Sequence, residues 1–238
     1  MLSFTRGVKM KNKSSKIIIF IVLIILLLGS LGFVCYKTFF NNSKDASKFK
    51  EEYESLNGTK NENNGNEYMK MDIAKDNPIK YATIDEIMKK LDGTAIILFG
   101  FPECPWCRNS IPVMLDAAKA SGVETIYYLN ALDQRDIKSL DDNGKVVTDK
   151  EGTEAYNKLI EKLGDHASVY GGLNDETIKR LYFPTAFFVK NGTIIGSHVG
   201  TVDSQKDPYI ALTSKEKDEL KQIFINYMEQ ITTCDDNC

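Results

Sequence analysis

The stretch that decides the fold runs Gly100-Phe101-Pro102-Glu103-Cys104-Pro105-Trp106-Cys107-Arg108. It follows an apolar run over residues 95–99 and precedes a helical pattern over residues 110–119. A strand that ends in a short turn, with C-x-x-C opening the next helix, brings two thiols close enough to form a disulfide. The first thiol then lies near unpaired backbone N–H groups and the positive end of the helix dipole, which favour a thiolate. This context indicates a redox site.

The two cysteines also fit half of a zinc site, because zinc-binding pairs use the same spacing. A zinc ion would need two further ligands. The candidates are His166, His198, Cys234 and Cys238, none of which stands in a second C-x-x-C or H-x-x-x-H arrangement. We therefore predict no metal site, and expect each histidine to be a surface or hydrogen-bonded residue.

Length, charge and cysteine count narrow the class of protein. The chain has 238 residues, more than a usual single domain, and its apolar residues are unevenly spread. Its net charge of −3 argues against a nucleic-acid partner, for which a clustered basic excess is expected. The sequence has five cysteines, so at least one is unpaired or paired with another chain.

The N-terminal part predicts a membrane anchor. Residues 17–36 carry no charge and are long enough for a helix to cross the roughly 30 Å hydrocarbon layer. Residues 1–16 contain five basic residues and no acid, which places them in the cytoplasm and the rest of the chain outside. The alternative is a cleaved signal peptide ending near Ser30-Leu31-Gly32. However, the apolar run continues through Cys35 and is longer than a usual signal peptide's, which favours a retained single-pass anchor.

Composition divides the remaining chain into three parts. Residues 37–77 are rich in Asn, Lys, Glu, Ser and Gly, so we expect a disordered linker that spans roughly 35 Å. Residues 78–233 have the apolar periodicity of a folded domain. The tail over residues 234–238 reads Cys-Asp-Asp-Asn-Cys. We expect Cys234 and Cys238 to form a disulfide outside the membrane, with a mobile second redox pair as the alternative.

The folded part alternates helices and strands. Thr83 and Glu86 form a capping box before a helix that ends at Gly93. A buried strand over residues 94–99, the cysteine helix and a strand over residues 125–129 then predict a parallel βαβ unit.

The second half of the domain is less regular. Residues 133–181 are expected to be mainly helical cover, with a helix over 153–163 and a short helix containing Ile178 and Leu181. Asn191-Gly192 then predicts a hairpin, and Thr213 caps a last amphipathic helix.

From about Ala95 to Ile231 this order resembles the thioredoxin fold. Cys104-Pro105-Trp106-Cys107 stands where that family has its redox pair, and Pro112 where its active-site helix is kinked. Phe183-Pro184-Thr185 matches the position of the family's cis-proline. The resemblance implies an α/β thioredoxin fold with an enlarged segment before the cis-proline strand.

A narrower resemblance is to membrane-anchored thioredoxin-like proteins of Gram-positive bacteria, the group called bacteriocin transport accessory proteins. It is carried by the long segment before Pro184, by Gly200-Thr201 and by residues 212–216. It implies an extracytoplasmic protein disulfide oxidoreductase whose partners are protein or peptide thiols and disulfides. A membrane electron-transfer protein or an exporter is a further expected partner, and no cofactor beyond the redox-active disulfide is expected.

Thiol–disulfide exchange assigns a role to each residue of the predicted site. Cys104 would be the attacking thiolate, and Cys107 would resolve the mixed disulfide. A cis Pro184 would place the backbone of Phe183 beside the cysteines, where an extended substrate could pair. We interpret Trp106 as a substrate contact. A non-catalytic module that holds a peptide or an exporter in the same groove is the alternative function.

The sequence departs from the thioredoxin pattern behind the second cysteine. That family has a buried Asp six residues before the first cysteine, where this chain has Leu98. Glu103 is the nearest acid and a candidate for proton transfer. Its charge would raise the pKa of Cys104, whereas Arg108 and the helix terminus would lower it, so the direction of exchange, oxidation or reduction, stays open.

Overall fold

The computed structural model of the chain describes residues 19–20, 22–24 and 44–233. The predicted anchor over 17–36, apart from those five helical residues, and the cysteine tail over 234–238 lie outside the described residues. Within the described part, no helix is both long and apolar enough to cross a bilayer. The chain divides into two units, residues 1–44 and 45–238, and the second contains the fold described below.

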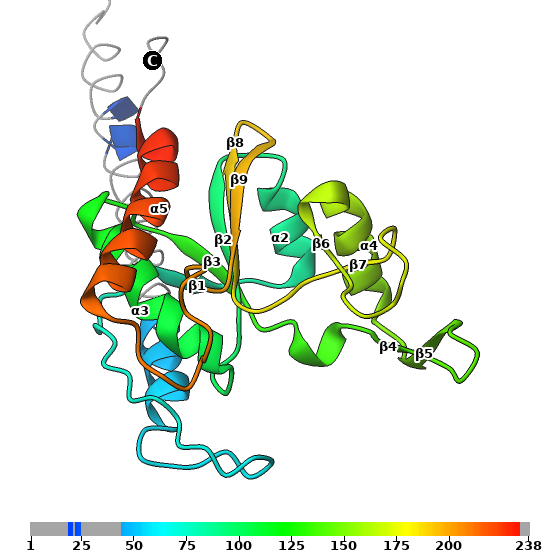
Figure 1. Cartoon of the computed structure of the whole chain (residues 1–238). Helices are drawn as coiled ribbons and strands as arrows, with labels where there is room; N and C mark the ends of the chain where they lie inside the picture. The colour runs from blue at the N-terminus through cyan, green and yellow to red at the C-terminus, as the bar shows by residue number, and fades with distance from the viewer. Residues whose placement is uncertain (1–18, 21, 25–43, 234–238) are drawn as a thin grey trace, which may run out of the picture. The chain divides into compact units, whose positions relative to one another are not determined.

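A five-stranded mixed sheet forms the centre of this unit, with the strand order β1-β3-β2-β8-β9 (Figure 1). The first three strands are parallel to one another, and β8 and β9 are antiparallel to their neighbours. The predicted α/β class and the parallel βαβ unit are therefore confirmed. The bounds are β1 Ile79–Tyr81, β2 Ala95–Phe99, β3 Ile126–Leu129, β8 Thr185–Lys190 and β9 Thr193–Val199.

Local signals placed several of these elements correctly. Asn191 and Gly192 both have positive φ, 51° and 77°, as the tight turn between β8 and β9 requires. Capping boxes begin α2 (Ile84–Lys90) at Thr83 and α5 (Ser214–Thr232) at Thr213, because each threonine exchanges hydrogen bonds with the acid three residues later.

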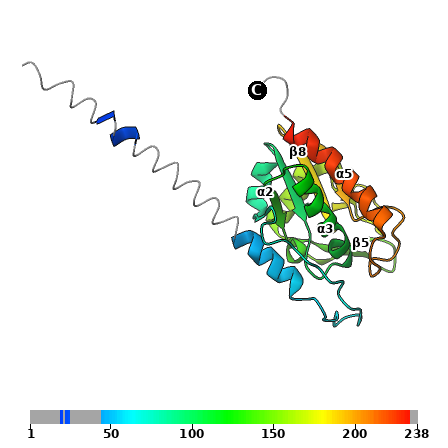
Figure 2. The same cartoon turned by 90° about the vertical axis from the view of Figure 1, so that its left-hand side faces the viewer.

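Helices cover both faces of the sheet. Figure 1 shows α3 (Pro105–Ala120) beside α5 on one face, and α2 beside α4 (Glu154–Leu163) on the other. Figure 2 views the face covered by α3 and α5. The side chains of β2 and β8 are almost all apolar and buried. This arrangement brings the start of α3, and with it both cysteines of the C-x-x-C motif, to the end of β2.

The predicted linker is wrong for residues 45–77, which belong to the folded unit. Residues 44–54 form a helix whose Phe49 and Tyr53 are fully buried against the sheet, and Met71 and Ile73 are 2% exposed. The spacing of Phe49 and Tyr53 places both rings on one face of the helix. Average composition concealed this face, because the residues around it are polar. Residues 37–43 lie outside the described residues.

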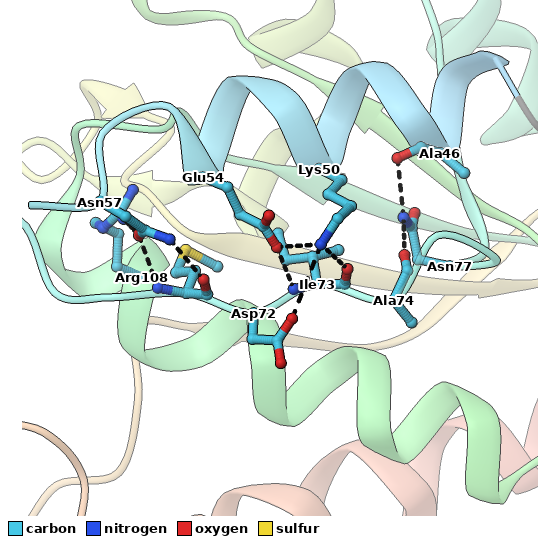
Figure 3. Close-up of polar contacts among 10 residues, drawn as sticks. Ala46, Lys50, Glu54, Asn57, Asp72, Ile73, Ala74, Asn77 and Arg108 are labelled. Carbon is cyan, nitrogen blue, oxygen red and sulfur yellow. Dashed lines mark hydrogen bonds and ion pairs between the residues drawn. The ribbon is translucent and has the colours of Figure 1, made fainter.

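Polar contacts hold the returning chain against this helix (Figure 3). Lys50 Nζ donates to the Ile73 carbonyl at 2.7 Å, and Glu54 accepts from the Ile73 N–H at 2.6 Å. Asn77 Nδ2 donates to the Ala46 carbonyl at 3.0 Å and to the Ala74 carbonyl at 2.8 Å. The folded domain therefore begins at about Asp45 and not at Pro78.

The segment before β8 contains more strand than expected. The helix predicted over 153–163 is confirmed as α4, but β4 (Ile137–Leu140) and β5 (Val146–Lys150) form a hairpin. The predicted helix containing Ile178 and Leu181 is wrong, because β7 (Lys179–Arg180) pairs with β6 (Ser168–Val169) there. Leu181 is buried at the domain core, so its apolar character reflected burial and not helical periodicity. Short 3-10 helices occupy Leu132–Gln134 and Gly164–His166.

Candidate active site

The start of α3 places Cys104 and Cys107 next to each other. Cys104 is the N-cap residue, and its sulfur accepts a hydrogen bond from the Cys107 N–H at 3.3 Å. Pro105 fits the first helical position, where no intrahelical N–H bond is needed. Cys107 lies one turn inside the helix and is fully buried, whereas Cys104 is 4% exposed. Both are free thiols.

The loop before β8 lies against the first cysteine. The Phe183–Pro184 peptide bond is cis, which confirms that prediction. The Cys104 thiol donates to the Phe183 carbonyl at 3.4 Å. The Phe183 ring packs edge-to-face on Phe101, with ring centroids 5.5 Å apart. Residues 79 positions apart in sequence thus meet at one sulfur atom.

The two thiols differ in acidity. The pKa of Cys104 is lowered, first by the hydrogen bond from the Cys107 thiol and then by N–H groups of Cys107 and Trp106, with a further contribution from the charge of Arg135. Burial opposes this shift. The pKa of Cys107 is raised well above its usual value, chiefly by burial and then by its interaction with Cys104. One thiol is therefore suited to ionise first and the other to stay protonated until a later step.

The other predicted site residues are arranged around this pair. Trp106 is half-buried and packs against the core. Glu103 is exposed, and its carboxylate makes no hydrogen bond or ion pair within the described residues. Leu98, which stands six residues before Cys104, is buried within β2 and offers no carboxylate there. Cys234 and Cys238 lie outside the described residues.

The histidines behave as the sequence predicts. His166 is exposed, and Nε2 of His198 donates to the Thr201 carbonyl at 2.9 Å. Across the described ranges, no three His, Cys, Asp or Glu side chains come together as possible metal ligands.

Arg108 forms hydrogen bonds with the folded segment over residues 45–77. The residue is 1% exposed, and its guanidinium donates to the carbonyls of Met69 (2.7 Å), Tyr53 (2.9 Å) and Pro102 (3.1 Å) and to the side chain of Asn57 (2.9 Å). Figure 3 shows the bond to Asn57. The residue directly after the second cysteine therefore joins α3 to the N-terminal segment.

Arg135 is a site residue that sequence reasoning missed. Its guanidinium carbon lies 4.9 Å from the centre of the Phe183 ring, and Nη1 donates to the Leu181 carbonyl at 3.2 Å. The guanidinium thus lies over Phe183, whose carbonyl accepts from Cys104, and its charge is one of the causes that lower the pKa of Cys104. No local signal marks it, because its position depends on a loop whose fold the sequence did not predict.

Removing this charge should make Cys104 less reactive. We expect Arg135→Gln to raise the pKa of Cys104, because a cation that favours the thiolate is lost. Alkylation of Cys104 at neutral pH should then be slower, and the midpoint of its pH profile should move to higher pH. Lys145→Gln removes an exposed charge from the turn between β4 and β5 and is the control, because solvent screens it. Identical profiles for the two variants would show that Arg135 does not tune this thiol.

No protein-family model matches the chain, and no curated protein matches it significantly.

Proposed function

We propose that the chain is a membrane-anchored thiol–disulfide oxidoreductase with a thioredoxin fold. The observation that carries the proposal is the meeting of three groups: Cys104 at the cap of α3, Cys107 one turn later, and the carbonyl of Phe183 before the cis-proline. The strand order β1-β3-β2-β8-β9, with helices on both faces, supports the thioredoxin assignment.

The exchange begins at Cys104, because its thiol ionises first. The thiolate attacks a substrate disulfide, a bond forms between the two sulfurs, and the other substrate sulfur leaves as a thiolate that takes a proton from solvent. Cys107 then attacks the Cys104 sulfur, and its proton passes to the departing substrate thiolate. The products are a Cys104–Cys107 disulfide and a reduced substrate. Oxidation of a dithiol substrate follows the same steps in reverse.

An extended segment of the substrate is proposed to bind along the loop before β8. The main chain of Phe183 would pair with it, and the accessible part of the Trp106 indole would contact its side chains. Such main-chain pairing selects an exposed or unfolded substrate segment more than a particular sequence. Proteins or peptides with cysteines in such segments are therefore the proposed partners.

The proposed location follows from the N-terminal sequence. A helix over residues 17–36 would hold the folded unit at the outer side of the membrane, where secreted and surface proteins form disulfides. Each turnover leaves the Cys104–Cys107 pair oxidised or reduced. A membrane electron-transfer protein is therefore the proposed partner that restores it, and an exporter is the proposed source of substrates.

The function can be tested by turnover. We expect the full chain in detergent to accelerate reduction of a disulfide-bonded protein by dithiothreitol. The double variant Cys234→Ser, Cys238→Ser should keep the rate, because the exchange is assigned to the cysteines of α3. A full chain no faster than dithiothreitol alone would contradict the proposed function. A rate lost only in the double variant would instead make the tail a second redox pair.

A further inference from the structure

A buried tyrosine lies next to the second cysteine. The Tyr53 hydroxyl oxygen and the Cys107 sulfur both lie close to the point that a Cβ on Gly100 would occupy, at 3.4 Å and 3.2 Å. Both side chains are fully buried. Because glycine has no Cβ, the hydroxyl group and the thiol can both approach this one point.

Tyr53 forms a hydrogen-bonded pair with Tyr128, and the hydrogen bonds of this tyrosine pair fix the direction in which each hydroxyl donates. Tyr128 Oη donates to the Gly100 carbonyl at 2.9 Å, and Tyr128 and Tyr53 share a hydrogen bond at 3.1 Å. A phenol has one proton, so Tyr53 must be the donor to Tyr128. The Tyr53 proton can therefore turn away from Tyr128 without breaking the bond to Gly100.

When Cys107 attacks the mixed disulfide, its sulfur needs a hydrogen-bond donor beside it. Cys107 must become a nucleophile in a fully buried position, where a thiolate without a hydrogen bond is costly. Leu98 offers no polar group, but Tyr128 is its register partner on β3, so the two side chains lie on the same face of the sheet. The tyrosine pair thus brings hydroxyl groups to the face that lacks an acid.

We propose that the Tyr53 hydroxyl assists Cys107 when the mixed disulfide is resolved, an inference that rests on the proposed function. As the S–H proton passes to the departing substrate thiolate, the Tyr53 hydroxyl turns from Tyr128 and donates to the Cys107 sulfur. The Cys104–Cys107 bond forms while the bond from Cys104 to the substrate breaks. Tyr128 and Gly100 act as positioning residues.

The tyrosines donate a hydrogen bond and do not remove the proton. Burial raises the pKa of Tyr53 well above its usual value, and burial likewise raises that of Tyr128, so both hydroxyls stay neutral. A neutral phenol can stabilise a nearby thiolate by donation. This is why the proton is assigned to the departing substrate sulfur.

The segment over residues 45–77 holds this hydroxyl in place. The Phe49 ring lies 4.5 Å from that of Tyr53 and 4.8 Å from that of Tyr128. Arg108 binds the Tyr53 carbonyl from the active-site helix. The N-terminal segment is therefore part of the active site.

Release of a coloured aromatic thiol separates the two chemical steps. For this experiment, Cys35→Ser, Cys234→Ser and Cys238→Ser are introduced into the full chain, so that Cys104 and Cys107 are its remaining thiols. This triple variant is the parent for the measurements below. A symmetric aromatic disulfide then gives one thiol when Cys104 attacks, and a second when Cys107 displaces it. We expect Tyr53→Phe to slow the second phase by about 10- to 100-fold, the value of a hydrogen bond to a charged group, and to leave the first phase unchanged.

The pH dependence of the second phase distinguishes loss of the Tyr53 hydrogen bond from a change in core packing. The second phase of Tyr53→Phe should require higher pH, because the Cys107 thiolate has lost a donor. Tyr81→Phe is the matched control: its ring lies 5.2 Å from that of Tyr128, but its hydroxyl donates to Glu52. Equal second phases in the parent and both variants, or equal slowing in both variants, would overturn the inference.

A second variant crowds the two groups without removing a hydroxyl. Gly100→Ala places a methyl group against both the Cys107 sulfur and the Tyr53 hydroxyl, and should also slow the second phase. An unslowed second phase in this folded variant would count against the inference. A parent chain that lacks the second phase would overturn the proposed function itself.

Discussion

Cys104→Ser is expected to reduce turnover of a protein disulfide to the rate without enzyme. A serine hydroxyl stays protonated at neutral pH, so the variant has no nucleophile where the substrate sulfur would bind. Stability should change little, because serine is a good N-cap residue and can accept the same backbone N–H bond. Turnover and thermal unfolding, measured on the same preparation, check both parts of this expectation.

A variant that unfolds with the parent and yet retains turnover would contradict the assignment of Cys104. Cys107→Ser provides the matched comparison, because it removes the second thiol and keeps the first. It should slow net reduction after the first bond has formed, because dithiothreitol from solution must then resolve the mixed disulfide at Cys104. The two variants therefore distinguish loss of attack from loss of resolution.

Arg108→Ala is expected to lower the free energy of unfolding by about 3–5 kcal/mol. The guanidinium is buried and satisfies acceptors from three separate parts of the chain, which would lose their donor together. Arg108→Lys should recover part of the loss, because an ammonium keeps the charge but cannot reach all the acceptors. Urea unfolding of the full chain measures the difference.

Lys158→Ala is the control for this prediction. Its ion pair with Glu154 is largely exposed on α4, with side chains 63% and 83% exposed, so its removal should have little effect on stability. Equal unfolding midpoints for Arg108→Ala and Lys158→Ala would show that Arg108 does not hold the N-terminal segment. Limited proteolysis within residues 55–70 should be faster in Arg108→Ala alone.

Local chemistry predicted the parts of the fold that depend on neighbouring residues. Thr83 and Thr213 each have an acid three positions later, and Asn191-Gly192 permits positive φ, so these starts and turns can be read directly. The C-x-x-C context likewise placed Cys104 at a helix cap.

Contacts between distant residues were not predictable in this way. Phe49 and Tyr53 are two apolar rings within a polar stretch, and they are buried because Tyr128, 75 positions after Tyr53, lies beneath them. Arg108 gives no local sign that its acceptors lie near residues 53–69. Periodicity reports how residues repeat along one element and carries no information about the element that covers them.

The most direct test of thiol–disulfide exchange is to map the adducts of Cys107→Ser. The full-length variant is expressed at the membrane, thiols are blocked with an alkylating agent, and disulfide-linked complexes are isolated and mapped by mass spectrometry. The proposed mechanism predicts mixed disulfides between Cys104 and cysteines of secreted or surface proteins, which disappear when Cys104→Ser is added. Absence of Cys104 adducts, or adducts confined to Cys234 and Cys238, would contradict it.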